Sequence, residues 1–349
     1  MKRIVECVPN YSEGRDRSVI DGIAGAIASV DGVKVLNVDP GQAANRTVIT
    51  FVGEPASVVE AAFRGAAKAK ELIDMRVHHG THPRSGSTDV LPLIPIEGIT
   101  LEECAALARG LAERMYTELG IPCYCYEAAA FKPEHRNLAA CRAGEYEALP
   151  EKMADPARRP DFGEAFDENA ARTGASNVGA RNYLIAVNFN LNTDSARKAM
   201  SVACDVREKG RKARVGGTPD GELLKDADGK QVWIPGTLKG CKAIGWYIEE
   251  YGIAQVSMNI TDIEATPLHI AYEEVCRAAA ARGLRVTGTE IIGLVPKRVL
   301  LDAGRFYLER EGHPADASED ELLATAVRCL HLDDLKPYDP RQRVIEYLM

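Results

Sequence analysis

With 349 residues, the chain is long enough to bury a sizeable core and to form two packed units. Hydrophobic residues make up 46% and charged residues 27%, and the formal net charge of −8 argues against a general nucleic-acid or membrane-surface binder. No apolar run approaches the roughly 20 residues that a membrane-spanning helix needs, and the apolar run at the start is too short for a signal peptide.

The first part of the chain predicts a strand, a helix, two strands, a helix and a strand, which is the ferredoxin-like order. Apolar runs or alternation mark the strands, and apolar residues three or four apart mark the helices. The predicted strands are 3–9, 33–38, 46–52 and 90–96, and the predicted helices are 16–29 and 55–73.

Further elements follow before the middle of the chain. Thr100 and Glu103 form a capping box at the start of a long helix, and Gly120 is its expected end. A strand is predicted at 122–127, a helix or turn at 142–153, and a polar linker at 155–179.

The second half predicts the same βαββαβ order without obvious sequence repetition. The predicted strands are 182–190, 241–250, 253–260 and 285–292, and the predicted helices are 194–209 and 267–282, the second capped by Thr266. Between the helix 194–209 and the strand 241–250, the segment 210–240 is expected to be a plain surface loop or a mobile flap, with a hairpin turn at Asp228-Gly229. Two or three helices are expected after residue 296.

These patterns together predict an α+β protein with two ferredoxin-like (βαββαβ) subdomains, 1–180 and 181–349. Each subdomain is expected to have a mixed or antiparallel sheet with helices on one face. We also expect a ligand cleft between the subdomains, because ligand sites occur preferentially at domain interfaces.

A polar loop in the first half, Ile73–Asp89, holds three of the seven histidines. Loops fixed between core elements often carry chemistry. His78 and His82 have the spacing of a zinc-binding helix, but the loop contains a glycine and prolines and lacks the glutamate of that motif, so a metal is the least favoured interpretation. A solvated role is favoured for His79, and acid–base catalysis for His82, because imidazole titrates near pH ~6.5.

Arginines in loops or at element ends could bind a substrate carboxylate through two parallel hydrogen bonds. They are Arg46, Arg84, Arg172 and Arg181. Asp39 ends a buried strand and could orient His82 or stabilise its imidazolium; the alternative is an aspartate that forms a turn before Pro-Gly. An imidazole beside arginines suits proton transfer during group transfer between anionic substrates, with no metal.

Other site types find little support. The sequence contains no P-loop, no Rossmann fingerprint and no serine nucleophile elbow. The predicted strand 253–260 places Gln255, Ser257 and Asn259 on one face. That face could bind the edge of a heterocycle or simply meet water, and the residues favour neither.

Nine cysteines are scattered along the chain, most of them inside apolar runs and none with CxxC spacing. An odd number without a framework pattern is typical of reduced thiols that pack as small hydrophobic side chains. The sequence therefore predicts a cytoplasmic protein, since that compartment keeps thiols reduced.

Six segments, in order and over nearly the whole chain, closely resemble the glutamate formiminotransferase family. They are Glu6–Gly14, Asn45–Thr47, Leu72–Met75, His82–Arg84, Arg142–Glu147 and Gly293–Pro296. Tyr11 stands where the family pattern has phenylalanine. In vertebrates this unit is the front part of a bifunctional formiminotransferase-cyclodeaminase. The present chain ends where the linker would begin, so we expect a free-standing transferase that is functionally linked to a separate cyclodeaminase.

The resemblance implies transfer of the formimino group from N-formimino-L-glutamate to N-5 of tetrahydrofolate, in histidine degradation and one-carbon metabolism. Tetrahydrofolate, which can be polyglutamylated, would be a co-substrate, and no metal is implied. The family's catalytic histidine falls on His82. The resemblance also implies a homodimer, without nucleic-acid or membrane partners.

The family's folate-contacting segment falls on about 163–174 of this chain. Its residues are Gly163, Glu164, Ala165, Phe166, Asp167, Glu168, Asn169, Ala170, Ala171, Arg172, Thr173 and Gly174. Alternatives to this function remain open. A related transferase could use a formyl or formiminoglycine donor, a folate-binding protein could lack turnover, and a metal-dependent hydrolase ranks third.

Overall fold

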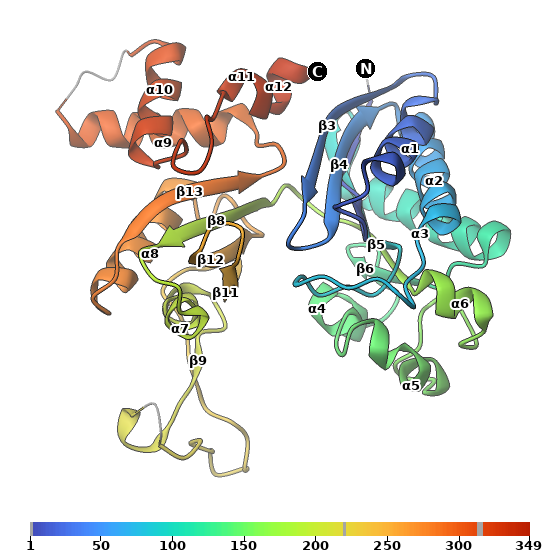
Figure 1. Ribbon diagram of the computed structural model, residues 1–349, viewed down its shortest axis with the longest axis horizontal. Helices are drawn as coiled ribbons and strands as arrows, with labels where there is room; N and C mark the ends of the chain where they lie inside the picture. Colours follow the sequence, from blue (N-terminus) through green and yellow to red (C-terminus); the bar gives the residue numbers. More distant parts are fainter. Residues whose placement is uncertain (1–2, 219–220, 313–316) are drawn as a thin grey trace. The chain divides into compact units, whose positions relative to one another are not determined.

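The computed structural model describes residues 3–218, 221–312 and 317–349 (Figure 1). The chain divides into two compact units, one formed by residues up to 182 together with Met349, and the other by residues 183–348. In the described residues, no helix is both long enough and apolar enough to span a membrane.

The first unit is built on a seven-stranded sheet. Its strands are β1 (Ile4–Cys7), β2 (Asn10–Tyr11), β3 (Val33–Gly41), β4 (Arg46–Gly53), β5 (Thr88–Glu97), β6 (Cys123–Glu127) and β7 (Ser176–Ala180). β1 and β2 share one central position, because both pair antiparallel with β4 and β5. The order β3, β4, β1, β5 is that of a ferredoxin-like sheet, which β7 and β6 extend with parallel pairing.

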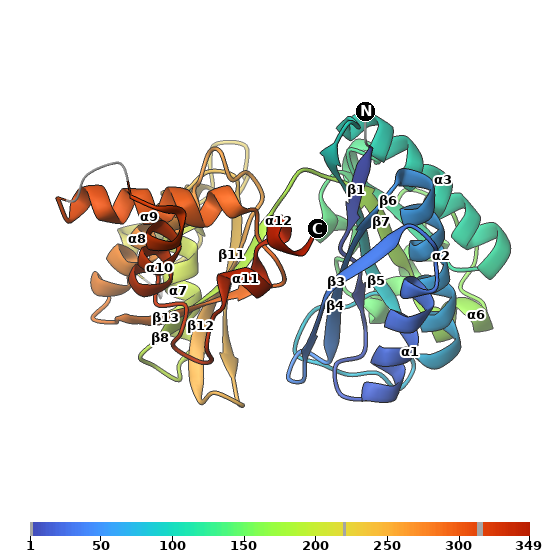
Figure 2. The ribbon, with the colours of Figure 1, turned by 90° about the horizontal axis from the view of Figure 1, so that it is seen from above.

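Three long helices cover one face of this sheet (Figure 2). They are α1 (Arg17–Ala28), α2 (Pro55–Leu72) and α3 (Leu101–Leu119). Their apolar stripes pack on alternate strand residues such as Cys7 and Phe51. The capping box at Thr100 forms as predicted, and Gly120 ends α3 in the left-handed conformation, at φ 67°.

The other face of the sheet is partly covered as well. α4 (Leu138–Cys141) and α5 (Leu149–Ala154) flank the 3-10 turn η2 (Tyr146–Ala148), and the 3-10 turn η1 (Pro133–His135) precedes them. Cys141 and Leu149 pack against Val90, Tyr124 and Tyr126. The expectation of helices on one face is therefore confirmed for α1–α3. At the β6 end of the sheet, α4 and α5 also cover part of the other face.

The prediction of a polar linker at 155–179 is wrong. This stretch contains α6 (Glu168–Thr173) and the buried strand β7. β7 consists of Ser, Asn, Val, Gly and Ala, so it lacks the bulky apolar residues that mark a strand in a sequence. Its burial comes from parallel pairing with β5 and β6 on either side.

The second unit is a four-stranded antiparallel sheet in the order β11, β12, β8, β13. Its strands are β8 (Ile185–Leu191), β11 (Cys241–Ile248), β12 (Ile253–Ile260) and β13 (Val286–Ile292), and its crossover helices are α7 (Ala196–Val206) and α8 (Leu268–Ala280). This confirms the second ferredoxin-like subdomain. The cap predicted at Thr266 is wrong: Pro267 is the N-cap of α8, and the Thr266 hydroxyl donates instead to the Lys239 carbonyl.

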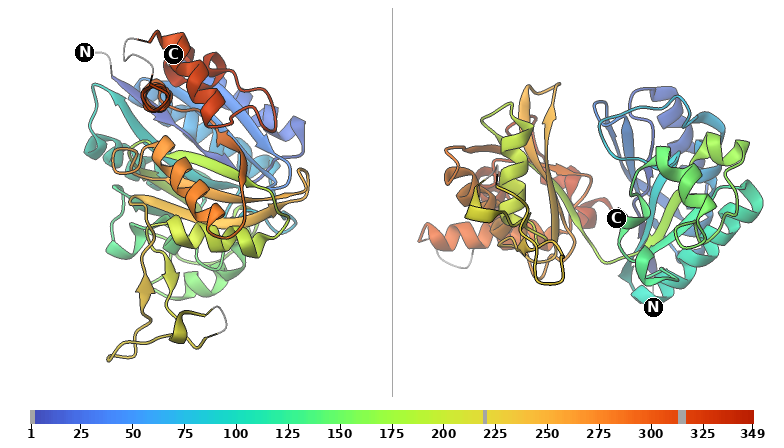
Figure 3. Two further views of the ribbon diagram at one scale, coloured as in Figure 1. Left: turned by 90° about the vertical axis from the view of Figure 1, so that its left-hand side faces the viewer. Right: turned by 90° about the horizontal axis from the view of Figure 1, so that it is seen from below.

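The segment 210–240 is more than a plain loop. The short strands β9 (Arg211–Lys212) and β10 (Trp233–Ile234) pair, and the 3-10 turn η3 (Val215–Gly217) follows β9. The resulting ribbon extends away from the sheet of its unit (Figure 3). The predicted turn forms, since the Gly229 N–H donates to the Asp226 carbonyl at 3.0 Å.

Four helices close the second unit in its described part. They are α9 (Lys297–Arg310), α10 (Glu319–Cys329), α11 (Pro340–Arg343) and α12 (Ile345–Leu348). Leu300, Ala303 and Leu323 of this group join the same apolar core as the strands of the sheet. The C-terminal helices are therefore part of the unit's core and not an appendage.

Candidate active site

The histidine loop, residues 73–87, is fixed at both ends by a segment about 90 residues further along the chain. The Met75 N–H donates to the Arg172 carbonyl at 2.8 Å, and the Ser87 N–H donates to the Thr173 carbonyl at 2.7 Å. The Ala175 N–H donates back to the Ser85 carbonyl at 2.8 Å. The loop therefore has a defined backbone path although it contains no helix or strand.

Two glycines make this docking possible. Gly86 and Gly174 lie opposite each other in an antiparallel bridge. A Cβ at Gly86 would lie 2.6 Å from the Ala175 carbonyl oxygen, and one at Gly174 would lie 2.2 Å from that of Ser85. Gly174 also has φ +65°, which side chains rarely adopt.

His82 lies between two arginines that come from different elements. Nη1 of Arg46, the first residue of β4, is 2.6 Å from Nδ1 of His82, and Nη2 of Arg142, just after α4, is 3.4 Å from it. Nδ1 is also 2.8 Å from the Pro83 carbonyl oxygen, to which Arg142 donates. The structure thus brings together His82 and Arg46 from the predicted site, and it adds Arg142.

The two guanidinium groups meet at one carboxylate, that of Asp89. Oδ2 of Asp89 is 3.1 Å from Nη1 of Arg46 and 2.8 Å from Nη2 of Arg142. The Asp89 side chain is fully buried, and the two arginine side chains are each 13% exposed. Burial alone would raise the pKa of Asp89, but Arg142 and Arg46 hold it below its usual range. Two cations and one anion leave one positive charge beside the imidazole.

This environment keeps His82 neutral at physiological pH. Burial is the largest cause, and the charges of Arg46 and Arg142 add to it, which together lower the pKa of His82 to about 3. A neutral imidazole can accept a proton, which is what a general base must do. An anionic ligand beside the two arginines would offset their charge and raise this pKa again.

The other two histidines of the loop have different surroundings. His78 is buried, and its Nε2 lies 2.9 Å from the Asn45 carbonyl oxygen. Burial is also the main cause that lowers the pKa of His78. His79 is exposed, in line with the solvated role that the sequence favoured.

Arg84 forms an ion pair with Glu147. Its Nη1 and Nη2 make two parallel bonds to the Glu147 carboxylate, at 3.0 and 2.8 Å, and Nη2 also donates to the His78 carbonyl at 3.0 Å. This is the fork geometry that the sequence suggested for a substrate carboxylate. The substrate-binding role of Arg84 stays a prediction, and it would require Glu147 to be displaced.

Asp39 and Arg181 belong to the sheet of the first unit or directly follow it. Asp39 is on β3, opposite Val48 of β4. Arg181 follows β7 and hydrogen-bonds to Tyr126, a buried residue that also interacts electrostatically with Arg46. The carboxylate that bridges the two arginines at His82 is Asp89, and the catalytic role of Asp39 stays a prediction.

The predicted folate-contacting segment contains buried, half-buried and exposed residues. Gly163, Ala170, Thr173 and Gly174 are buried and support the fold. Exposed residues are Glu164, Ala165, Asp167, Glu168 and Arg172. Asp167 caps α6 and Glu168 pairs with Arg76. Phe166, Asn169 and Ala171 are half-buried. The assignment of the whole segment to folate stays a prediction, and the four buried residues are the least able to contact a ligand.

Sequence reasoning missed Asp89 and Arg142. Asp89 is the second residue of β5, directly after the histidine loop, and Arg142 is the first residue of one of the segments that carry the family resemblance. Neither residue was given a role from the sequence. No spacing rule joins them, because they are 53 residues apart and meet only through the packing of α4. Asn10 was missed for the same reason; its Oδ1 accepts from Nε of Arg46 at 2.8 Å.

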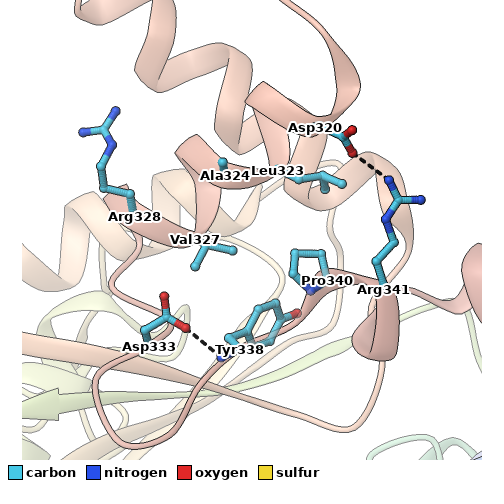
Figure 4. A pocket seen from close by; sticks show the side chains of 9 residues that line it. All are labelled: Asp320, Leu323, Ala324, Val327, Arg328, Asp333, Tyr338, Pro340 and Arg341. Carbon is cyan, nitrogen blue, oxygen red and sulfur yellow. Dashed lines mark hydrogen bonds and ion pairs between the residues drawn. The ribbon is translucent and has the colours of Figure 1, made fainter.

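The second unit offers a polar sheet face and a cavity. Gln255 is buried and donates to Oδ1 of Asn190 at 2.8 Å, so its amide is used inside the unit. A cavity of about 420 Å³ lies between α10 and the segment 333–341 (Figure 4). Arg341 there pairs with Asp320 at 2.6 Å. The cavity holds none of the predicted site residues.

In residues 3–218, 221–312 and 317–349, no group of three or more His, Cys, Asp or Glu side chains could hold a metal ion.

Comparison with known protein families assigns both halves of the chain. The family described as "Formiminotransferase domain, N-terminal subdomain" matches residues 4–181, and "Formiminotransferase domain" matches residues 186–349.

Individual relatives agree with these family matches. The chain is 45% identical over 350 residues to a formimidoyltransferase-cyclodeaminase of Sus scrofa, covering all of the chain and 60% of that relative. It is 40% identical over 311 residues to glutamate formimidoyltransferases of Streptococcus pyogenes serotype M1 and Thermoplasma acidophilum. These matches cover 89% and 88% of the chain, and 95% and 93% of the relatives.

Proposed function

The chain belongs to the formiminotransferase family, and we propose that it transfers the formimino group of N-formimino-L-glutamate to N-5 of tetrahydrofolate. The family matches cover nearly the whole chain, and two relatives of similar extent are named glutamate formimidoyltransferase. The cyclodeaminase activity in the name of the longer relative is a property of that protein, of which this chain spans 60%.

The single observation that carries the proposal is the position of His82 between Arg46 and Arg142. Attack by the N-5 amine on the formimino carbon forms a new C–N bond and a tetrahedral intermediate. The attacking nitrogen must then lose a proton, and the glutamate nitrogen must gain one before its bond to carbon breaks. An imidazole that starts neutral can accept the first proton and deliver the second.

The positive charge at this site fits the two substrates, which both carry carboxylates. Arg46 and Arg142 outnumber Asp89 by one charge. We propose that Arg46, with Arg84 and Arg181 as further candidates, binds a substrate carboxylate, and that tetrahydrofolate contacts the exposed part of 163–174. Once a carboxylate is bound, the imidazole becomes a stronger base, because the local positive charge is offset.

The test is an absorbance assay for formimino transfer with purified protein, tetrahydrofolate and formiminoglutamate, with and without a chelator. We expect turnover that the chelator does not change. A panel with a formyl donor and formiminoglycine in place of formiminoglutamate tests the related activities. Folate binding without transfer from any donor would contradict the proposal and identify a binding protein, and loss of activity with the chelator would identify a metal enzyme.

The assembly and location of the protein are part of the proposal. We propose a homodimer with a subdomain boundary after residue 180, working in the cytoplasm in histidine degradation. All nine cysteines are free thiols and six are buried, which fits a reducing compartment. Light scattering of the purified protein tests the dimer, and a single-chain mass would contradict it.

A further inference from the structure

Asp89 occupies a central position that no sequence pattern suggested. Its Oδ2 accepts from both Arg46 and Arg142, at 3.1 and 2.8 Å, and both arginines also reach His82. Arg46 comes from β4, Arg142 from the turn after α4, and Asp89 from β5. One carboxylate therefore connects the two cations that flank the imidazole.

The carboxylate itself is held from its other side. Its Oδ1 accepts from the Ser85 N–H at 2.9 Å and from the Ser85 hydroxyl at 3.0 Å. The side chain of Asn177, on β7, donates to the Ser85 hydroxyl at 2.9 Å and to the Asp89 carbonyl at 2.8 Å. Both oxygens of Asp89 are thus engaged, so the carboxylate has one orientation.

The charge of Asp89 stabilises the arrangement of the two arginines. Two guanidinium groups at the same imidazole repel each other, and the anion between them removes that repulsion. We propose that Asp89 is a positioning residue for the transfer reaction, which holds Arg46 and Arg142 against His82 and so fixes the orientation of the imidazole. This inference rests on the proposed function. It gives Asp89 the orienting role that the sequence suggested for Asp39, and it leaves Asp39 free for another.

The groups that act on the His82 imidazole include Arg46, Arg142, Asp89 and the Pro83 carbonyl. In Asp89→Asn the arginines lose their common anion and are expected to move away from the ring. The His82 ring, followed by NMR titration of the purified protein without substrates, should then titrate at a higher pH than in the unaltered protein, although burial still keeps its pKa below the ordinary value of about 6.5. Loss of the Asp89 charge by itself would lower the pKa of His82, so a rise reports movement of the arginines. A folded Asp89→Asn protein in which His82 titrates at no higher pH than in the unaltered protein would therefore overturn the proposal.

Kinetics provides a second readout. We expect kcat of Asp89→Asn to fall by at least about tenfold, a part of what acid–base catalysis supplies, and to fall by more than KM rises. An unchanged kcat would overturn the proposal. The NMR readout needs no turnover, so absence of transfer in the unaltered protein would refute the proposed function while leaving the effect of Asp89 on His82 measurable.

A matched control is available in the same unit. Asp161 is also a buried carboxylate, 4% exposed, and it pairs with His135 at 2.8 Å. Asp161→Asn should lower thermal stability as a buried-charge replacement does, but should leave the titration of His82 unchanged. An equal shift of His82 in both variants would mean general loosening of the unit and would overturn the specific role of Asp89.

A milder variant covers the case in which Asp89→Asn does not fold. Ser85→Ala removes one hydroxyl donor to Asp89 and keeps every charge. It should move the His82 titration in the same direction by a smaller amount. A His82 titration identical to that of the unaltered protein would then overturn the proposal.

Discussion

Nη1 of Arg46 lies 2.6 Å from Nδ1 of His82, so a permanent cation touches the ring expected to move protons. A guanidinium can only donate hydrogen bonds, and it disfavours a second positive charge beside it. Together with burial, which contributes most, this contact explains why the ligand-free site holds a neutral imidazole.

The first prediction concerns the dependence of stability on pH. The pKa of His82 is lowered to about 3 in the folded protein and is about 6.5 in the unfolded chain, so the unfolded chain binds the proton first. His82 therefore contributes to a loss of stability as pH falls from about 6.5 towards 3. Chemical unfolding at pH 7 and pH 5 should show a smaller loss for His82→Asn than for the unaltered protein. Equal losses would contradict a neutral His82.

The second prediction concerns catalysis by His82. We propose His82 as the group that exchanges protons with the substrate nitrogens, so His82→Ala should lower turnover by about 10²–10⁴-fold. Folate binding and the melting temperature should change little, because His82 lies in a loop and outside the apolar cores of the protein. Assays of transfer and of folate binding on the same preparation check this, and near-normal turnover would remove His82 from the mechanism.

The third prediction tests the assignment of Arg84. If Arg84 binds a substrate carboxylate, Glu147 competes with the substrate for the same guanidinium. Glu147→Gln should then lower KM for formiminoglutamate by up to about fivefold, since an ion pair with one exposed partner is worth about 1 kcal/mol or less. An unchanged KM with a lower melting temperature would assign Arg84 to the structure of the loop instead.

The fourth prediction concerns Tyr11, which stands where the family pattern has phenylalanine. Its side chain is fully buried, and its hydroxyl has no hydrogen-bond partner in the described structure. A buried unsatisfied hydroxyl costs about 1 kcal/mol or more. Tyr11→Phe should therefore raise the free energy of unfolding by about 1 kcal/mol, as measured by urea unfolding. A loss of stability would show that the hydroxyl is satisfied in solution.

The fifth prediction concerns the docking of the histidine loop. Gly174→Ala would place a Cβ against the Ser85 carbonyl at a positive φ, so both stability and turnover should fall. Gly229→Ala is the matched control, because Gly229 has φ +75° with open space around it. Gly229→Ala should lower the free energy of unfolding by about 1 kcal/mol, because alanine is strained at a positive φ, and should leave turnover unchanged. Equal kinetic effects would contradict the role of Gly174 in the loop.

The sequence predicts most of the fold because periodic apolar residues and caps are local signals. The capping box at Thr100 and the end of α3 at Gly120 follow from residues a few positions apart. β7 was missed because its small and polar residues are buried only through β5 and β6. The site follows the same division: His82 and Arg46 could be named from their residue types, whereas Asp89 and Arg142 acquire their roles only when α4 packs near the loop.

The backbone hydrogen bonds of Ser85 and Ser87 limit when the histidine loop can close during synthesis of the chain. Their partners, Ala175 and Thr173, leave the ribosome only after most of the first unit has been synthesised. The loop that carries His82 thus closes late, on a sheet whose antiparallel strands are already complete. A nascent chain that stops before residue 173 would hold every strand from β1 to β6 and still lack the backbone hydrogen bonds that close the loop of His82.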